Sequence, residues 1–166
     1  MPIRPATRAD VAKIDGLLAL SVHRPYHDAE QYAAMIERRD GYENQIIHVG
    51  ASSSVRLVLL PERNLIEIGW WLWDGSDEAD WLGVMRAALE QAIAEQPGAL
   101  GWDIGGTFDA PGETFEARSR NSRAVALRES RWLPGVRVVA VGEPSPWWRA
   151  EHSVAATLAE LVRRGV

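Results

Sequence analysis

The segment Leu65–Trp73 carries one carboxylate within a run of apolar and aromatic residues. Alternation along an extended strand predicts that Glu67 shares a face with Trp71 and Trp73. A carboxyl group beside indole rings is expected to have a raised pKa, which suits a proton acceptor. Glu67 is therefore the candidate base, and an exposed glutamate on a solvated sheet face is the alternative interpretation. His48 is a weaker candidate, because isolated histidines are more often structural.

Acidic side chains gather where a long helical pattern begins, at Asp74, Asp77, Glu78 and Asp80. Carboxylates near a helix N-terminus stabilise the helix by about 0.3–1 kcal/mol each, because they face free N–H groups and the positive end of the helix dipole. For the same reason they compete with a bound phosphate. Capping of the helix is one interpretation of these acids, and a rearranged anion-binding loop is the other.

A metal site is not predicted. His23 and His27 have the i, i+4 spacing of a helical metal pair, but Pro25 interrupts a helix between them. The chain has no cysteine, which excludes disulfides, thiolate zinc sites and a cysteine nucleophile.

Arginines crowd one predicted helix, residues 121–131, and the segment before it. Planar guanidinium groups favour carboxylate and phosphate partners. The cluster is interpreted as a solvated helix face, as a docking surface for an acidic protein, or as a phosphate site. Tryptophans after the last predicted strand form a second interface candidate, since tryptophan is favoured at interface hot spots. A protein partner or a homo-oligomer is therefore expected through Arg123, Arg128, Trp147 and Trp148.

The composition fits one globular domain. The 166 residues are 46% hydrophobic and 25% charged, and the net charge of −5 argues against binding to nucleic acid or anionic membranes. The sequence starts without an apolar signal region, and no window reaches the ~18 uninterrupted apolar residues of a membrane span. A cytoplasmic protein without nucleic-acid or membrane partners is expected.

Hydrophobic periodicity and turn residues predict a mixed α/β order with an antiparallel meander in the middle and crossover helices after it. Capping-box spacing marks the first two helices, at Thr7 with Asp10 and at Asp28 with Gln31, and Gly41 is the expected stop of the second. The predicted strands are residues 3–4, 45–49, 55–60, 65–73, 99–104 and 136–141. The later predicted helices are residues 78–96, 121–131 and an amphipathic helix at 151–164, and residues 105–120 are expected to be a long loop.

Three stretches, in this order, carry a resemblance to a known family: IRPATRADVAKIDGLL, LIEIGWWLWDGSDEADWLGVMRAALEQAIAE and NSRAVALRESRW. They resemble the first strand and helix, the central strand with the cofactor helix, and the acceptor-end helix of the GNAT (Gcn5-related N-acetyltransferase) superfamily. The resemblance implies a GNAT-like mixed sheet over about residues 3–141. It also implies transfer of an acyl group from acetyl-CoA or another acyl-CoA to an amine.

The resemblance further implies a role for each site residue. Glu67 would act as the catalytic base, and the backbone near Trp71 and Trp73 would hold the pantetheine arm. The CoA pyrophosphate would lie on the loop aligned with the family's phosphate motif. With the asparagine of the acceptor-end helix, the expected cofactor-binding residues are Trp71, Trp73, Asp80, Trp81, Leu82, Gly83, Val84, Met85 and Asn121.

The chain departs from the family pattern at several of these positions. Asp80 stands where the family has Gln or Arg, Met85 replaces a small residue, and Arg128 replaces the usual Tyr general acid. An arginine cannot donate a proton at ordinary pH, because its pKa is above about 12. The alternative function is therefore a catalytically inactive GNAT-fold protein that binds or assembles, for example a phage virion-associated or other assembly subunit.

The end of the chain is expected to differ from the family. Residues 1–143 are predicted to form the GNAT-like domain and residues 144–166 a C-terminal segment. The resemblance implies a last strand that forms a hairpin with residues 136–141. This chain has Pro144, Pro146 and two tryptophans there, and then the extra amphipathic helix. The segment is expected either to cover the sheet of the domain or to dock on another subunit.

Overall fold

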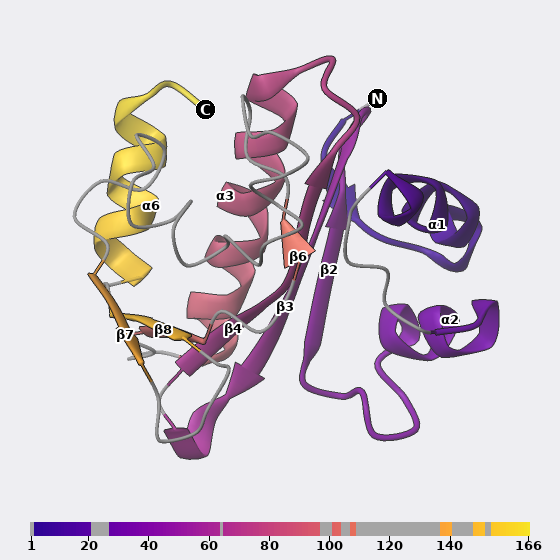
Figure 1. The fold of residues 1–166 in the computed structure, drawn as a ribbon, viewed down its shortest axis with the longest axis horizontal. Helices are drawn as coiled ribbons and strands as arrows, with labels where there is room; N and C mark the ends of the chain where they lie inside the picture. Colours follow the sequence, from indigo (N-terminus) through magenta and orange to yellow (C-terminus); the bar gives the residue numbers. More distant parts are fainter. Residues whose placement is uncertain are drawn as a thin grey trace.

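The computed structural model describes residues 2–20, 27–63, 65–96, 101–103, 107–108, 137–140, 148–151 and 154–166. It is a mixed α/β structure, which is the predicted class (Figure 1). Its elements are β1 (Arg4–Pro5), the 3-10 helix η1 (Arg8–Asp10), α1 (Val11–Ala19), α2 (Ala29–Glu37), β2 (Gln45–Val49), β3 (Ser53–Leu60), the 3-10 helix η2 (Pro61–Arg63), β4 (Leu65–Trp73), α3 (Glu78–Glu95), β5 (Gly101–Asp103), β6 (Thr107–Phe108), β7 (Arg137–Ala140), β8 (Trp148–Glu151) and α6 (Val154–Arg163).

One sheet runs through the described part of the chain in the order β1-β2-β3-β4-β5-β8-β7. Strands β1 to β4 are antiparallel neighbours, which confirms the meander predicted from residues 45–73. Strand β5 lies parallel to β4, where Leu65 is opposite Gly101, and the antiparallel pair β8 and β7 extends the sheet beyond it. The short β6 also pairs with β4 in parallel, within residues 105–120, which were expected to be loop.

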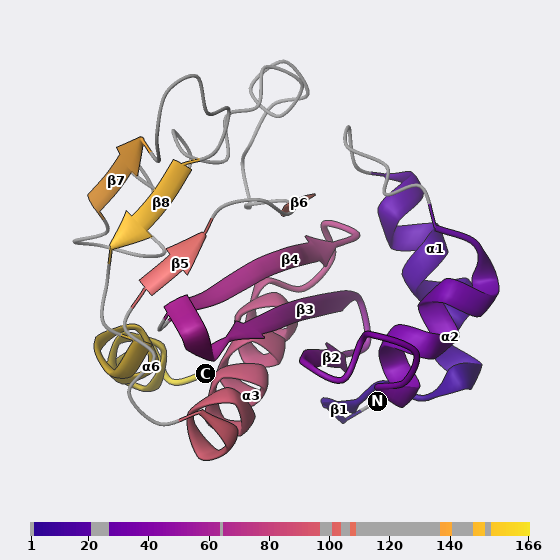
Figure 2. The ribbon, with the colours of Figure 1, turned by 90° about the horizontal axis from the view of Figure 1, so that it is seen from below.

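Helices cover both faces of the sheet (Figures 1 and 2). On one face α3 packs on β2, β3 and β4 and α6 lies beside α3, and this core includes Ile68, Trp71, Trp81 and Leu161. On the other face α1 and α2 pack on the same strands around Trp70 and other apolar residues. The central strands are therefore buried from both sides, which explains why their sequences are nearly continuous apolar runs.

A β-bulge in β4 shifts the alternation of its side chains. Leu57 of β3 is opposite Ile68, whereas the preceding Arg56 is opposite Trp70, so Gly69 is the extra residue of β4. A Cβ atom at residue 69 would lie 2.9 Å from both Cγ and Cδ of Arg56. Glycine at the bulge thus lets the Arg56 side chain cross directly over the β4 backbone.

Capping contacts begin the first two helical segments as predicted. The Asp10 carboxylate accepts hydrogen bonds from the backbone N–H of Thr7 at 2.7 Å and from the Thr7 hydroxyl at 3.0 Å. Asp28 and Gln31 cap each other, each side chain accepting from the other's backbone N–H at 2.9 Å. These reciprocal contacts satisfy N–H groups that have no partner inside the helix.

The predicted stop of α2 at Gly41 is wrong, because the helix ends at Glu37. Arg38 takes the left-handed backbone conformation at the C-cap, with φ of 56°. This conformation disfavours side chains larger than glycine. Arg38 compensates through its guanidinium group, which binds both carboxylate oxygens of Glu95 on α3 at 2.8 Å and the backbone carbonyl of Glu43. Glycine could not make these contacts.

Acid unfolding is expected to depend on Asp10. Hydrogen bonds from Arg4, at 2.8 Å to each carboxylate oxygen, and from Thr7 lower the pKa of Asp10 to about 2. This stabilisation is fully present above the unfolded pKa of about 4 and is lost as the pH falls towards 2. Urea denaturation between pH 5 and pH 2 should show this loss in the wild type and a shallower loss in Asp10→Asn. Equal pH slopes in the two proteins would contradict this assignment.

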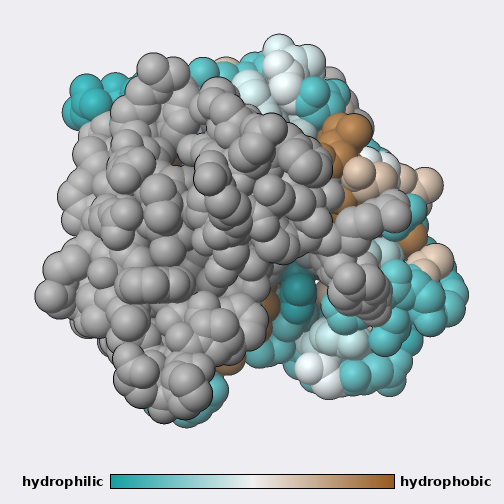
Figure 3. All heavy atoms as spheres, viewed as in Figure 1, coloured by the Kyte–Doolittle hydropathy of each residue, from teal (hydrophilic) through white to brown (hydrophobic). Residues whose placement is uncertain are grey.

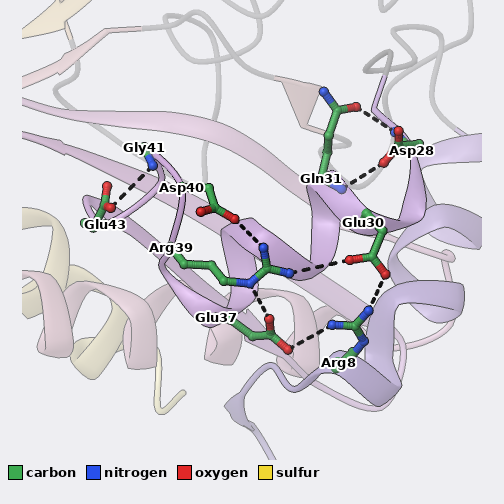
Figure 4. Close-up of polar contacts among 9 residues, drawn as sticks. All are labelled: Arg8, Asp28, Glu30, Gln31, Glu37, Arg39, Asp40, Gly41 and Glu43. Atoms are coloured by element: carbon green, nitrogen blue, oxygen red, sulfur yellow. Dashed lines mark hydrogen bonds and ion pairs between the residues drawn. The ribbon is translucent and has the colours of Figure 1, made fainter.

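Exposed ion pairs join η1 to α2 and to the turn after it (Figure 4). Arg8 pairs with Glu30 and Glu37, and Arg39 pairs with Glu30, Glu37 and Asp40. Hydrogen bonds, first from Arg39 and then from Arg8, lower the pKa of Glu37. Exposed pairs of this kind contribute at most about 1 kcal/mol each, so we assign the network a role in orienting α2 rather than in holding the fold.

The described surface near α2 is mostly hydrophilic, as the lower right of Figure 3 shows. Leu20 and Val162 are the large apolar side chains exposed among residues whose burial is described. No helix in the described ranges combines the length and the apolar character that crossing a membrane would require.

The expectation for the end of the chain is partly wrong. Strand β8 pairs antiparallel with β7, with Trp148 opposite Ala140, so a hairpin partner for residues 136–141 is present after all. Glu151 belongs to this strand, and the final helix begins only at Val154. Leu161 of that helix is buried in the core beside α3. Helix α6 therefore packs against α3 of the same chain.

Candidate functional site

The start of α3, where the sequence predicted a pyrophosphate site, is capped by the chain itself. The Asp77 carboxylate accepts hydrogen bonds from the backbone N–H groups of Ala79 at 3.0 Å and Asp80 at 3.2 Å. The N–H of Trp81 already bonds to the Asp77 carbonyl at 3.1 Å. A phosphate at this helix start would have to displace Asp77 and would meet its negative charge.

Asp80 accepts hydrogen bonds from a second group of donors, which lies in the turn between β2 and β3. Its carboxylate accepts hydrogen bonds from the backbone N–H of Ala51 at 2.8 Å and of Ser52 at 2.9 Å, and from the hydroxyls of Ser53 at 2.6 Å and Ser52 at 3.1 Å. The close approach requires Gly50, where a Cβ atom would lie 2.2 Å from Asp80 Oδ1. An internal carboxylate thus occupies the donors that an external anion would need.

Asp80 is held in its charged form. Burial alone would raise the pKa of Asp80, but the hydrogen bonds from Ser53, Ser52 and Ala51 outweigh burial and lower the pKa below its usual value. The carboxylate is therefore negatively charged at neutral pH near the start of α3, where a CoA pyrophosphate was expected.

The rest of the predicted phosphate loop lies inside α3. Its residues, Trp81, Leu82, Gly83, Val84 and Met85, are all buried. Within a helix, successive backbone N–H groups bond to carbonyls four residues earlier and do not point towards a ligand. These residues consequently form a packed helix and not a loop that wraps a phosphate.

Gly83 has a packing role at this position. A Cβ atom there would lie 2.5 Å from Cδ1 of Ile3 and 3.9 Å from Cγ1 of Val166. The small residue thus allows both ends of the chain to lie against α3. The glycine that aligned with the family motif is explained by this contact alone.

The predicted pantetheine-binding tryptophans are part of the same core. Trp71 stacks on Trp81 with ring centres 3.8 Å apart and an angle of 6° between the rings. The indole N–H of Trp71 donates to the Trp81 backbone carbonyl at 2.8 Å. Trp73 is half-buried, with its ring centre 6.2 Å from that of Trp81. The three indoles join β4 to the first turns of α3.

Glu67 does not share a face with Trp71 and Trp73, which corrects the sequence prediction. The bulge at Gly69 inserts one extra residue into β4 and so reverses the alternation of side chains. Two odd-numbered residues on either side of the bulge, such as Glu67 and Trp71, therefore face opposite sides of the sheet. Trp71 faces α3, whereas Glu67 is opposite Val58 on the face covered by α1 and α2. Glu67 is half-buried, and Trp70 is the tryptophan of β4 that packs on this same face.

The charged partner on this face is Arg56 of β3, which sequence reasoning missed. Its guanidinium carbon lies 5.3 Å from the centre of the Trp70 ring, and its Nε donates to Oε1 of Gln45. Burial lowers the pKa of Arg56, and the negative charge of Glu67 partly offsets this effect. A signal was present in the sequence, since Arg56 is the one charged residue in the apolar strand SSVRLVLL.

His27 adds a further titratable group near Arg56. Its ring packs edge-on against Tyr32 at 5.8 Å between centres, and Tyr32 packs in the same way against Trp70 at 6.1 Å. Burial and then the charge of Arg56 lower the pKa of His27. Within the described residues, the buried Nδ1 atom of His27 has no hydrogen-bond partner.

The other sequence candidates lie elsewhere. His48 is buried on the opposite side of β2, where its Nε2 contacts Oε1 of Gln91 on α3 at 2.7 Å, and burial lowers its pKa. Trp148 is placed only through its backbone in β8. The predicted helix at 121–131 lies outside the described residues, as do His23, Asn121, Arg123, Arg128 and Trp147.

Comparisons with models of known protein families and with curated protein sequences find no match for this chain.

Proposed function

We propose that the chain is a GNAT-like binding protein that does not transfer acyl groups from CoA. The order of elements supports the GNAT-like part of the proposal. An antiparallel meander leads into a long helix, a parallel strand returns beside β4, and the hairpin that the resemblance implies is formed by β7 and β8.

The contacts of Asp77 and Asp80 support the second part of the proposal, that the chain does not use CoA. Two carboxylates, of Asp77 and Asp80, take up the N–H and hydroxyl donors around the start of α3. Backbone N–H groups at a helix start are the feature that binds phosphate in this geometry. Here they are satisfied internally, and the added negative charge repels a pyrophosphate. N-acyl transfer with Glu67 as base is the alternative function.

Calorimetric titration with acetyl-CoA and with free CoA at low salt tests this proposal. We expect no heat of binding up to millimolar concentration, because the pyrophosphate would have to displace Asp77 and approach Asp80. Two variants are titrated beside the wild type. Asp80→Asn removes one negative charge at the start of α3, and its matched control, Glu90→Gln, removes an exposed charge from the far half of the helix. Micromolar binding of either ligand to the wild type would refute the proposal and restore acyl transfer as the function.

If CoA does bind, turnover separates the remaining cases. An acyltransferase that uses Glu67 as base should lose most of its turnover in Glu67→Gln with its fold intact. Unchanged turnover would remove Glu67 from the mechanism.

A further inference from the structure

The turn between β2 and β3 holds the Asp80 carboxylate as a protein holds a separate anion. The backbone N–H groups of Ala51 and Ser52 donate to it at 2.8 and 2.9 Å, and the hydroxyls of Ser53 and Ser52 donate at 2.6 and 3.1 Å. Successive N–H groups directed at one point are a recurring anion-binding arrangement, and hydrogen bonds to an ionised acceptor are stronger than neutral ones. These donors all belong to residues 51–53, so one short piece of chain supplies the site and α3 supplies the ligand.

Gly50 gives the turn room for a carboxylate. A Cβ atom at residue 50 would lie 2.2 Å from Oδ1 and 2.5 Å from Cγ of Asp80, so the turn backbone lies directly against the bound group. Ser52 and Ser53 are buried, whereas Ala51 is exposed. The donors therefore lie just beneath the surface, where a small anion can reach them once the Asp80 side chain is removed.

The charges around the turn are compatible with an anion in this position. Lys13 of α1 donates a hydrogen bond to the backbone carbonyl of Gly50, which brings an ammonium group to the turn. Asp77 has the opposite effect, because its carboxylate bonds to the backbone N–H of Asp80. A free carboxylate in place of the Asp80 side chain meets this same charge and adds no repulsion beyond that in the native chain. The pKa of Asp80 is lowered in spite of burial, so the donors favour the ionised form here.

Asp80 corresponds to a small ligand joined to the chain by a single bond. Beyond Cβ, its side chain is a carboxylate group with the size of formate, and the whole side chain has the size of acetate. We propose that residues 50–53 form a binding site for a small carboxylate, which Asp80 fills as an intramolecular ligand in the native chain. Tethering gives Asp80 a high effective concentration, so free carboxylates do not displace it. This inference goes beyond the proposed function, since it concerns a planar carboxylate and not CoA.

Removal of the intramolecular ligand tests the site. Asp80→Ala vacates the space of a formate ion, and the midpoint of its thermal unfolding should rise by about 3 °C in about 200 mM sodium formate, measured against sodium chloride at the same concentration. The increase should saturate, because it depends on filling one site. The wild type and Glu78→Ala, which loses an exposed acid from the same turn of α3, are the controls and should not show this saturating increase. No increase in Asp80→Ala, or an equal one in all three proteins, would overturn the proposal.

The shape of the vacated space gives a second test. In Asp80→Ala the remaining Cβ atom lies where the acetate methyl group would have to be, so acetate should bind about tenfold more weakly than formate. Asp80→Gly has no Cβ atom at this place, and acetate should bind to it at least as tightly as formate does. The dissociation constants come from the dependence of the unfolding midpoint on ligand concentration. The same order of affinities in both variants would contradict binding in the space that Asp80 leaves.

A measurement of refolding covers the case in which the vacated variants do not fold alone. Their folded fraction is followed by circular dichroism as sodium formate is added, beside Asp80→Asn, whose amide group fills the same space. Formate should restore the fold of Asp80→Ala and have no such effect on Asp80→Asn. An Asp80→Ala chain that stays unfolded in about 500 mM formate would overturn the site. Titration of the wild type with CoA is a separate experiment, so CoA binding refutes the proposed function, whereas a failure of formate refutes only the carboxylate site.

Discussion

Asp80→Ala should lower the free energy of unfolding by about 2–4 kcal/mol, because it leaves several buried donors without an acceptor. The donors are the backbone N–H groups of Ala51 and Ser52 and the hydroxyl of Ser53, all within 3.0 Å of the carboxylate. Chemical denaturation monitored by circular dichroism measures this loss. The effect should shrink as the pH falls below about 4, since protonation of Asp80 weakens the same contacts in the wild type.

Glu78→Ala is the matched control for this prediction. Glu78 is an exposed acid in the same first turn of α3 and should change stability by no more than about 0.5 kcal/mol. If Asp80→Ala were as mild as Glu78→Ala, the carboxylate would not be clamping the turn between β2 and β3. The argument that this site is closed to phosphate would then lose its main support.

Local signals in the sequence predicted much of the fold. The strands at Gln45–Val49 and Leu65–Trp73 have the predicted bounds, and the long helix ends one residue earlier than predicted. Apolar runs and capping residues within a few positions of each other determine these elements, so they can be read without knowing the tertiary structure.

Features that depend on distant partners could not be predicted in the same way. The end of α2 at Glu37 depends on Arg38 reaching Glu95, 57 positions later in the chain. The face of Glu67 depends on a bulge that only the register against β3 reveals. Strand β8 was missed because Pro144, Pro146 and the two tryptophans were taken to end strand structure, whereas pairing with β5 and β7 decides the outcome.

The candidate site shows the same division. Of the acids around the start of α3, Asp77 is the helix cap that one of the two interpretations predicted, because capping is a local property. That Asp80 reaches across to the turn at residues 50–53 is a tertiary contact with no local signature. Arg56 was overlooked for the same reason, since its importance comes from Trp70, Glu67 and Gln45 on other strands.

The largest loss of stability is expected from Trp81→Ala, at about 3–5 kcal/mol. Trp81 is fully buried, stacks on Trp71 at 3.8 Å and holds β4 against α3, so its removal leaves a cavity that rigid strands cannot close. The same variant should abolish the exciton signal of the stacked indoles in the far-ultraviolet circular dichroism spectrum.

Trp73→Ala is the variant that separates the packing role of the tryptophans from a role in ligand binding. Trp73 is only half-buried at 6.2 Å from Trp81, so its truncation should cost less, about 1–3 kcal/mol, and should leave the exciton signal in place. Had the tryptophans of β4 been kept for a pantetheine arm, Trp73→Ala would weaken CoA binding with little effect on folding. A loss of stability below about 1 kcal/mol for Trp81→Ala would contradict the packing role of the stacked indoles and favour a ligand-binding role.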